Sequence, residues 1–487
     1  MNKKEKRSFF DKKVVIGLGA GLYPLFHYYN GNFDIADTWY QLGFFLGISI
    51  VLPLALIAIS HGIMKLSATL KHSSYWLTAI NLAVFSGLLA FFIFLFDGWT
   101  ITLFVVMAIV LSLRLHRFIS KIVILQYLLA VMSLFTLVPK LMFMWNHSNE
   151  WAETSDGIDQ ADFKVYPNIY VIQPDGFTNF SELRKPPYNY EDPTFEQWLE
   201  ERNFVNYPNF RSNYYSTLTS NSSMFAMKHH YYNNTYPGNL KTFGSQAVIV
   251  GDNNWLRVLK HNGYKTHLIT DNSFFLTNRK LEGYDFCNIP QSEVLLHDTG
   301  GIPGVRTVRE FIDILDAADA PRNFYFIEKT TPGHIKYTDA SSGGPEVERE
   351  RYLHRLKTAE SWTTQLVKNI QRLDPNPLIV IVADHGGFVG LNSVKEVHRR
   401  KLDSLETISV FSSQLSIHWP YDDTPDDLVF RSNVNVFRNI IAYLSQNKSF
   451  LDNREPDESF LPFYEGQKAS YFLCIDDNGT VEYRSIE

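Results

Sequence analysis

The chain has 487 residues, a formal net charge of −6 and 20% charged residues. This length suits about two or three domains, and the lack of a basic excess argues against nucleic-acid binding. Its two cysteines, Cys287 and Cys474, exclude a disulfide framework and a zinc site built from several cysteines, while a single bridge between them stays open.

Apolar segments dominate the chain before Trp145. Those with few or no charges are residues 14–29, 41–60, 75–96, 99–113 and 122–144. A membrane-spanning helix needs about 20 apolar residues, so the second, third and fifth segments are long enough and the first and fourth are short. We predict a transmembrane domain over residues 1–145 with about five helices. If both short segments failed to cross, an odd number of spans would still remain.

Basic residues predict the orientation of this domain. They precede the first segment and lie in the loops after the second and the fourth: Lys3, Lys4, Lys6, Arg7, Lys12, Lys13, Lys65, Lys71, Arg114, Arg117 and Lys121. The loops NGNFDIADT and DG have none, so the N-terminus should be cytoplasmic and the chain after Trp145 should lie outside. The alternatives are a signal peptide for the first segment and a plain anchor for the whole region.

The remainder of the chain alternates between strand and helix patterns. Residues 146–165 are polar and predict a linker to an extracytoplasmic domain over residues 166–487. Strands are expected at 167–174, 264–270, 322–329 and 377–383, and helices at 193–203, 253–263, 305–317 and 347–373. This alternation predicts an α/β fold with a mostly parallel sheet sandwiched by helices. The last segment, SYFLCIDDNGTVEYRS, predicts a hairpin at the sheet edge.

Two of these strands end in acidic residues. The stretch PLIVIVADHGGFVG runs into Asp384, His385 and two glycines, and NIYVIQPDGF runs into Asp175. Ligands bind at the carboxyl ends of parallel strands, and two carboxylates with an imidazole suit zinc, manganese or magnesium. Neighbouring side chains on a strand point to opposite faces, so Asp384 and His385 meet one ion only if the glycines end the strand geometry. An ordinary turn is the alternative for each motif.

These residues resemble the alkaline phosphatase/sulfatase superfamily, and more narrowly its membrane-anchored branch of lipoteichoic acid synthase-like and phosphoethanolamine transferase-like proteins. The resemblance covers the order of the two domains and the motifs PNIYVIQPDGF, SNYYSTLTSNSSMF and IVADHGG. It implies an alkaline phosphatase-like fold in which Asp175, Asp384 and His385 bind a metal ion together with a hydroxyl nucleophile.

The second motif would supply this nucleophile. The family pattern Ser-Asn-Tyr-x-x-Thr, laid on this chain from Ser212, implies Thr217 as both nucleophile and metal ligand, with a helix starting in SNSSMFAM. A metal-bound hydroxyl at a helix N-terminus is easier to deprotonate. Chemistry alone leaves a Ser/Thr-rich capping segment and other hydroxyls open, namely Ser216, Thr219, Ser220, Ser222 and Ser223.

The resemblance also implies substrate-binding residues. His334 follows the strand RNFYFIEK and would contact the substrate phosphate or complete a second metal site. Trp255 and Arg257 in NNWLRVL would hold an anionic head group. The alternatives are a surface histidine and ordinary packing of a helix.

This chain departs from the family pattern at three points. Asp175 stands where the transferase branch commonly has glutamate. A Cys/Ser-x-Pro-x-Arg box is absent from the sequence, which argues against sulfate-ester hydrolysis through formylglycine. The several disulfides of periplasmic transferases cannot form with two cysteines.

The resemblance implies a metal-dependent phosphotransferase of the bacterial inner (cytoplasmic) membrane whose catalytic domain is periplasmic or extracellular. It would move a phosphoglycerol- or phosphoethanolamine-type group from a phospholipid donor to a cell-surface glycan or lipid acceptor through a phosphothreonine intermediate. One divalent ion is expected, with room for a second, and nucleic acid is not an expected partner. The alternatives are a sulfatase-like hydrolase of phosphate or sulfate esters and an inactive membrane scaffold.

Overall fold

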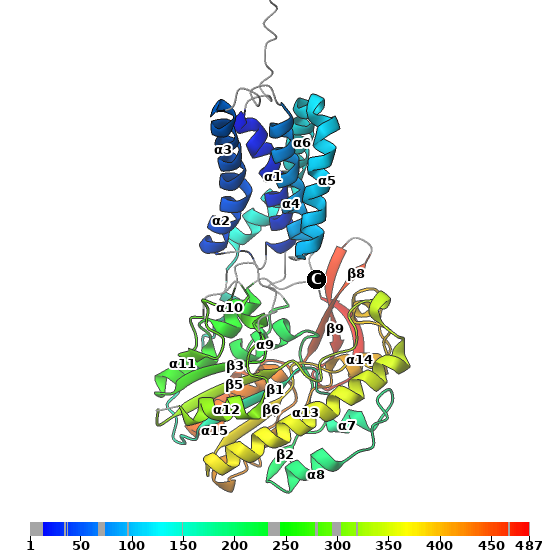
Figure 1. Ribbon diagram of the computed structural model, residues 1–487. Coiled ribbons are helices and arrows are strands. Elements are labelled where there is room, and N and C mark those ends of the chain that lie inside the picture. The colour runs from blue at the N-terminus through cyan, green and yellow to red at the C-terminus, as the bar shows by residue number, and fades with distance from the viewer. Residues whose placement is uncertain are drawn as a thin grey trace, which may run out of the picture. The chain divides into compact units, whose positions relative to one another are not determined.

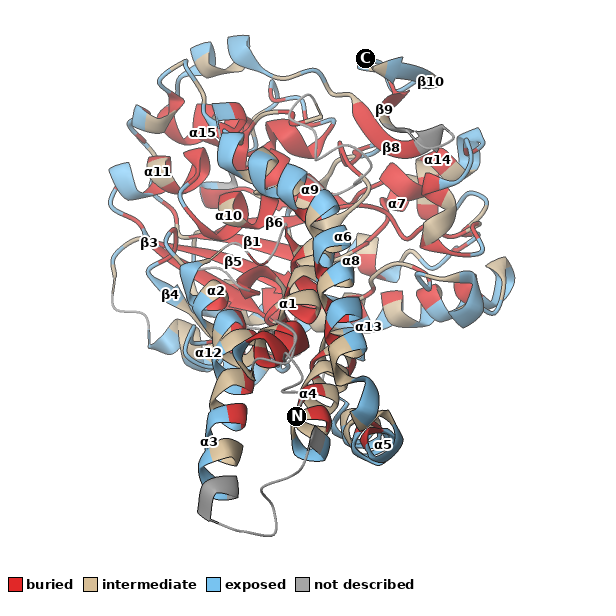
Figure 2. Ribbon diagram, turned by 90° about the horizontal axis from the view of Figure 1, so that it is seen from above, coloured by how far each residue is buried: buried red, intermediate tan, exposed pale blue. Residues whose placement is uncertain are grey.

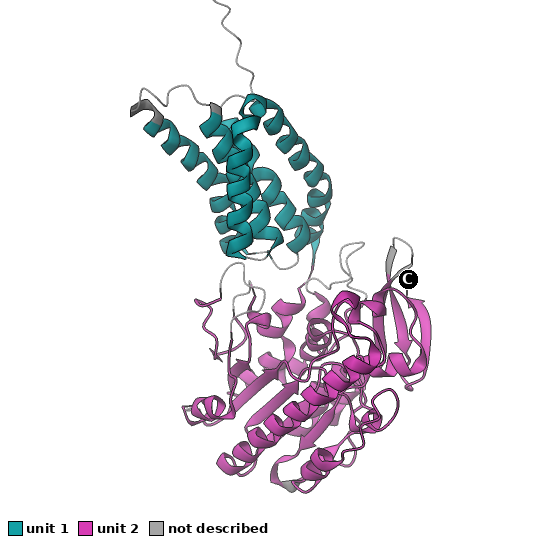
Figure 3. Cartoon of the chain, turned by 45° about the vertical axis from the view of Figure 1, so that its right-hand side comes forward, with its two compact units in different colours: residues 1–147 teal, residues 148–487 magenta. Residues whose placement is uncertain are grey.

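The computed structural model divides into two compact units, Met1–His147 and Ser148–Glu487 (Figures 1 and 3). It describes residues 13–33, 36, 38–66, 74–94, 97–148, 150–231, 244–277, 281–294, 303–317, 320–465 and 468–486. Most of the basic residues before the first helix, together with Lys71, lie outside the described residues. Each unit has its own hydrophobic core.

Unit 1 is helical over nearly all the described residues of the apolar segments named above. Its helices are α1 (Lys13–Asn32), α2 (Trp39–Leu46), α3 (Leu52–Leu66), α4 (Ser74–Ile93), α5 (Gly98–Leu115) and α6 (Ile119–Asn146). Among the described residues, three helical stretches are long and apolar enough to cross a membrane: Trp39–Ile63, Tyr75–Ile93 and Gly98–Asn146. The last stretch has 49 residues and includes both α5 and α6. The number of passes therefore stays a prediction.

Buried amides join three helices of unit 1. The Asn81 amide of α4 donates to the carbonyl of Ile16 in α1 over 2.7 Å, and it exchanges hydrogen bonds of 3.0 and 2.9 Å with Gln126 of α6. Polar groups inside an apolar bundle need such partners, because neither lipid nor the bundle core supplies water. The pair therefore fixes how these helices face one another.

Unit 2 is built on a mixed, mostly parallel sheet, as predicted. Its described strands are β1 (Ile169–Pro174), β2 (Phe204–Asn206), β3 (Lys265–Thr270), β4 (Phe286–Cys287), β5 (Asn323–Lys329), β6 (Leu378–Val382) and β7 (Leu415–His418). They lie in the order β2-β7-β6-β1-β5-β3-β4. β1 pairs in parallel with β5 and β6, whereas β7 runs antiparallel to β6 and β2. The central strand β1 is thus flanked by two parallel neighbours.

Helices cover both faces of this sheet (Figure 2). Side chains alternate along β1, so that Ile169 and Val171 enter one core while Tyr170 and Ile172 enter the other. The first core includes α9 (Thr217–Ala226), α10 (Ser245–Val250), α11 (Asn254–His261) and α15 (Val436–Ser445). The second includes α7 (Phe180–Leu183), α8 (Thr194–Glu200), α12 (Val308–Asp316), α13 (Pro345–Leu373) and α14 (Ser404–Phe411). The expected sandwich of helices around the sheet is therefore confirmed.

The C-terminal hairpin forms, but its expected place at the edge of the main sheet was wrong. β9 (Lys468–Ile475) and β10 (Val481–Ile486) pair antiparallel around a turn in which Gly479 has a φ of +88°. Together with β8 (Ser459–Glu465) they make a separate sheet. Phe460 and Leu473 of this sheet pack with Tyr214 in a small core, while Leu461 and Phe472 join the larger core that contains α13.

Two further predictions concern residues 146–165, expected as a linker, and the two cysteines. Trp151, Ile158 and Phe163 of the segment expected as a linker are buried in the core of unit 2, so much of that segment packs as part of the unit. Cys287 and Cys474 are both free thiols.

Candidate metal centre

Two loops meet at one edge of the main sheet. β1 and β6 are adjacent and parallel, so Asp175 after β1 and Asp384 after β6 leave the sheet at the same edge. Glycines make the approach possible. A Cβ atom on Gly176 would lie 2.8 Å from the backbone of Gly333, and one on Gly387 would lie 2.4 Å from a ring carbon of Tyr352.

Asp175, Asp384 and His385 form a cluster that can hold a metal ion. One ligand atom from each lies within 4.8 Å of the others. The Nε2 atom of His385 is 3.4 Å from Asp175 Oδ1 and 3.3 Å from Asp384 Oδ2. The side chain of Asp175 is 16% exposed, while those of Asp384 and His385 are buried.

The unpaired acceptor atoms of the cluster fit a divalent cation. Among the described residues, Asp175 Oδ1 and Asp384 Oδ2 are buried and accept no hydrogen bond. Asp384 Oδ1 accepts instead from the Gly176 N–H over 3.0 Å. His385 Nδ1 must donate to the Gly386 carbonyl at 2.8 Å, because a carbonyl only accepts, and this leaves the Nε2 lone pair facing the carboxylates. Two oxygens and one imidazole nitrogen then point into the same space.

The electrostatics of the cluster also call for a positive charge. Burial raises the pKa of Asp175 to about 7, and the nearby Asp384 adds to this rise. Burial opposes protonation of His385, but the carboxylates of Asp384 and Asp175 outweigh it, so its pKa is raised. A bound cation would relieve both effects by favouring the carboxylates and the neutral imidazole.

Thr217 lies beside this cluster as the first residue of α9, so the helix begins earlier than the sequence predicted. Its Oγ1 is 3.4 Å from His385 Nε2. The rival hydroxyls are used elsewhere: those of Ser216 and Thr219 bond each other, and those of Ser220, Ser222 and Ser223 bond Asn433, Thr219 and Lys228. Of these candidates, the structure brings Thr217 to the cluster.

The Ser-Asn-Tyr part of the motif anchors the loop that presents Thr217. The Asn213 side chain accepts from Val434 N at 2.7 Å and donates to Glu458 O at 2.8 Å. The Tyr214 ring stacks on His230 with centroids 4.0 Å apart, and its hydroxyl accepts from His230 N at 2.8 Å. These side chains therefore hold the backbone in place.

His334 reaches the cluster from the loop after β5. Its ring centroid lies 5.9 Å from that of His385, and its Nδ1 donates to the Ile335 carbonyl at 2.6 Å. Burial lowers the pKa of His334 to about 4, so the ring is neutral at pH 7 with its Nε2 lone pair free to accept. Arg355 of α13 fixes this loop by donating to Pro332 O at 2.6 Å and to His334 O at 2.9 Å.

The structure does not bring Trp255 and Arg257 to the cluster. Trp255 is fully buried, stacks on Phe437 at 4.3 Å and contacts Phe324 near the start of β5, the opposite end from the loop that carries His334. Arg257 pairs with Glu153 and, at 2.8 Å, with Asp252. Their expected contact with a head group finds no support in this arrangement.

Sequence reasoning missed Glu328, the penultimate residue of β5. It is 2% exposed and pairs across the sheet with Gln173 of β1 and Thr270 of β3. Burial raises its pKa well above the usual range, and Asp271 adds to the rise. An acid inside the apolar run FYFIEK was the available signal. Tyr352 and Arg355 on α13 were missed as well, because they look like ordinary members of a long amphipathic helix.

Comparisons with protein-family models and with curated proteins find no match. Among solved structures, the C-terminal periplasmic domain of EcEptC from Escherichia coli aligns with 15% identity and a TM-score of 0.41, covering 63% of this chain and 94% of that one. The lipooligosaccharide phosphoethanolamine transferase EptA from Neisseria meningitidis, an integral membrane protein, aligns with 11% identity and a TM-score of 0.39, covering 89% and 95%. At such low identities and TM-scores, we draw no conclusion about activity from these likenesses.

Proposed function

We propose that this chain is a membrane-anchored, metal-dependent phosphotransferase. It moves a phospho-substituent of the phosphoglycerol or phosphoethanolamine type from a phospholipid to a cell-surface glycan or lipid. The observation that carries the proposal is the convergence of Asp175, Asp384 and His385 with the Thr217 hydroxyl, whose Oγ1 is 3.4 Å from His385 Nε2. Apolar helices in unit 1 that are long enough to cross a membrane support action on a lipid-borne donor.

All four residues would bind the metal ion, and Thr217 would also attack the phosphorus. Asp175, Asp384, His385 and Thr217 would hold a divalent ion, which would supply a lowered pKa for the threonine hydroxyl and screening of the phosphate oxygens. Thr217 begins a helix of 10 residues, so the free N–H groups of its first turn favour a phosphate there. The Nδ1–H of His385 donates to Gly386 O, which leaves Nε2 available to the ion.

The reaction has two displacements. The Thr217 oxygen attacks the phosphorus of the phosphodiester, the bond from phosphorus to the lipid alcohol breaks, and the lipid leaves with the proton that Thr217 gave up. A phosphothreonine remains, in which the phosphate still carries the head-group alcohol as a diester. An acceptor hydroxyl then attacks the same phosphorus, the bond to Thr217 breaks, and the acceptor proton returns to the Thr217 oxygen. In-line geometry and charge stabilisation account for most catalysis of this kind.

His334 would accept a hydrogen bond in the second displacement, when the acceptor hydroxyl attacks the phosphorus. Its Nδ1 is committed to Ile335 O, so its Nε2 can receive a hydrogen bond from the acceptor hydroxyl or provide a ligand to a second ion. In the proposed arrangement the protein belongs to the bacterial inner membrane, with a cytoplasmic N-terminus and unit 2 periplasmic or extracellular, as the distribution of basic residues predicts.

Labelled phospholipid tests the proposal directly. The detergent-solubilised protein, incubated with a donor that carries a labelled head-group phosphate, should label a surface glycan or lipid acceptor. Thr217→Ala should abolish turnover while bound metal is retained, and Asp384→Ala should lose both. Thr219→Ala removes a hydroxyl two residues further along the same helix and should stay active. A peptide that contains Thr217 and carries the phosphate with its head-group alcohol should appear by mass spectrometry when the acceptor is withheld.

The outcomes separate the competing functions. Label that passes only to water, in the presence of acceptor, identifies a hydrolase and ends the transferase assignment. Purified protein that binds no metal and turns over no phosphodiester would identify a scaffold. Full turnover by Thr217→Ala would remove the nucleophile from the proposal.

A further inference from the structure

A pocket on unit 2 has none of the metal-cluster residues in its lining. It has a volume of about 440 Å³ and is lined by segments around α7, α14, the β2–α9 loop and the β9–β10 turn. A volume of this size is within the range of sites for small organic ligands, and is larger than a single ion needs.

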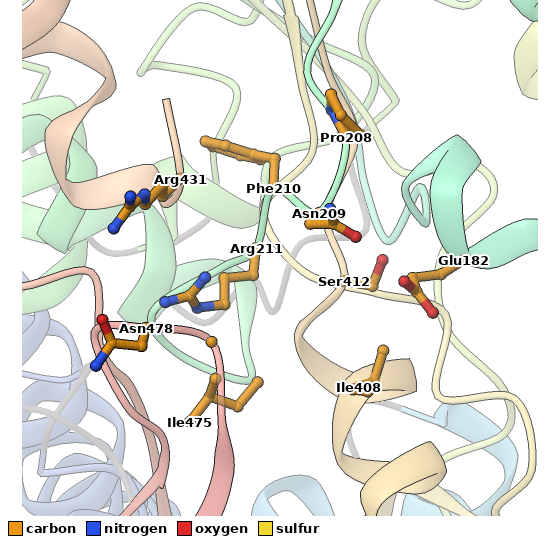
Figure 4. A pocket seen from close by; sticks show the side chains of 11 residues that line it. Glu182, Pro208, Asn209, Phe210, Arg211, Ile408, Ser412, Arg431, Ile475 and Asn478 are labelled. Carbon is orange, nitrogen blue, oxygen red and sulfur yellow. The ribbon is translucent and has the colours of Figure 1, made fainter. Parts of the chain in front are cut away.

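One end of the pocket is basic. Arg211 and Arg431 both line it, and Figure 4 shows the Arg211 guanidinium between Arg431 above it and Asn478 below. Arg211 is 8% exposed, with Nη2 donating to the carbonyls of Asp457, Asp476 and Asp477, whereas its Nη1 takes part in none of these bonds. Within the described part of the chain, the side chain of Arg431 makes no hydrogen bond or ion pair.

The nearby acids do not fill this end. The Asp457 carboxylate accepts hydrogen bonds from the Ser432 hydroxyl and the Asn435 amide. The Asp477 carboxylate accepts one from the Asp457 N–H. These bonds join segments that are distant in sequence. Neither Asp457 nor Asp477 lines the pocket, although both carboxylates act electrostatically on Arg211. Two guanidinium groups that line one cavity favour a bound oxyanion, because Arg offers a planar set of donors that matches phosphate or sulfate.

The other end of the pocket suits hydroxyl groups. Glu182, Asn209 and Ser412 line it on the side away from the arginines in Figure 4. Glu182 is also paired with Lys185 at 2.8 Å, so its charge is balanced and its oxygens remain acceptors. A carboxylate, an amide and a hydroxyl together accept and donate as a sugar or glycerol requires.

We propose that this pocket binds a phosphate or sulfate ester of a polyol, with the ester group on Arg211 and Arg431 and the hydroxyl groups toward Glu182, Asn209 and Ser412. The polyol is either a sugar of a glycan or the glycerol of a lipid head group. The proposal does not depend on the proposed function, since none of the cluster residues takes part in it.

Binding is best measured in an Asp384→Ala background, so that the metal cluster does not compete for phosphate. Glucose 6-phosphate, glycerol 1-phosphate and inorganic phosphate are titrated into the full-length protein in detergent by calorimetry at constant ionic strength. Arg431→Gln removes one charge at an exposed position that supports no other side chain. Arg309→Gln, an exposed arginine of α12 outside the pocket, is the matched control.

We expect at least one of the two esters to bind more tightly than inorganic phosphate. Arg431→Gln should weaken the binding of that ester by about tenfold, the scale of one lost charge-assisted hydrogen bond. Arg309→Gln should leave the affinity unchanged. Preference for glucose 6-phosphate or for glycerol 1-phosphate names the source of the polyol. Absence of saturable ester binding, or equal affinity in Arg431→Gln, overturns the site, and equal binding of inorganic phosphate overturns the polyol part.

Discussion

The hydroxyl of Tyr352 donates a hydrogen bond of 2.9 Å to the backbone carbonyl of Gly176, the residue that follows Asp175. The same oxygen accepts from the Thr178 N–H at 3.1 Å, and the Tyr352 ring occupies the space that a side chain on Gly387 would need. One side chain of α13 therefore holds the turns after both β1 and β6, which carry the candidate metal ligands.

Replacing Tyr352 by phenylalanine should loosen these turns. The change leaves a buried carbonyl and a buried N–H without their partner, which costs about 1–3 kcal/mol. Because such supporting bonds orient ligands, metal affinity should fall by about tenfold or more. Metal titration and thermal melting of the purified protein measure the two effects. Tyr337→Phe, at an exposed tyrosine, should change neither. Unchanged metal affinity in Tyr352→Phe would show that the two turns keep their conformation without the Tyr352 hydroxyl.

Arg355→Lys should reduce turnover without removing the metal. Lysine keeps the charge but cannot reach both Pro332 O and His334 O as the guanidinium does, so the loop that carries His334 should lose its fixed position. We expect turnover to drop about tenfold with metal content unchanged, measured on labelled phospholipid. Arg372→Lys near the end of the same helix is the control. Wild-type turnover in Arg355→Lys would mean that His334 needs no such support.

The sequence predicted those parts of the molecule that depend on local pattern. Near-continuous apolar runs predicted β1 and β6. Asp175, Asp384 and His385 were named as a cluster because parallel strands deliver their carboxyl ends to one edge, and the structure places them together. The supporting residues could not be predicted in this way. Tyr352 lies more than 170 residues from Gly176 in sequence, so its contact exists only once the helix packs on the sheet.

Two expectations rested on patterns that do not specify tertiary neighbours. Trp255 and Arg257 were expected near a substrate from their resemblance to a motif, whereas the Trp255 ring stacks on Phe437 in the structure. The C-terminal hairpin was assigned to the main sheet because strand patterns do not specify a partner. β8 supplies the partner here, and its own pattern was not recognised.

Acid should destabilise unit 2 through His230. Burial lowers the pKa of His230 to about 4, against an ordinary value of 6.5. The unfolded chain therefore binds more protons between these values, so stability is complete above pH 6.5 and falls as the pH falls toward 4, by roughly 3 kcal/mol for this one group. The melting temperature of wild type should drop accordingly on acidification.

His230→Asn isolates this contribution. The variant should melt lower than wild type near neutral pH, because the stack on Tyr214 is lost, and its melting temperature should depend less on pH between 6.5 and 4. His261→Asn, at an exposed histidine of α11, is the matched control. If the melting temperature of His230→Asn depends on pH as strongly as that of wild type, His230 is not buried as a neutral ring.

Glu328 predicts the opposite dependence on pH. Its pKa is raised above the usual range by burial, with Asp271 adding to the rise. The unfolded chain then releases this proton at lower pH than the folded protein does. Stability should therefore be lost as the pH rises above about 4.5, the ordinary glutamate value.

The hydrogen bonds around Glu328 agree with a protonated carboxyl. Thr270 has one hydroxyl hydrogen and two oxygen neighbours, the Asn272 carbonyl at 2.8 Å and Glu328 Oε2 at 2.5 Å. The carbonyl can only accept, so both contacts are satisfied when Thr270 donates to Asn272 and Glu328 donates its own proton to Thr270. An ionised Glu328 would compete with Asn272 for the same hydrogen.

Glu328→Gln should therefore stabilise the metal-free protein at alkaline pH. Glutamine has nearly the shape of the protonated acid and can donate to Thr270 without ionising. The difference in melting temperature between Glu328→Gln and wild type should be small near pH 5 and grow toward pH 8, while Glu350→Gln at an exposed position of α13 should show no such trend. A bound divalent ion should shrink the difference, because its charge favours the ionised form of nearby carboxyls and Asp175 and Asp384 both act on Glu328. A constant difference across this pH range would place the ionised carboxylate in the folded state.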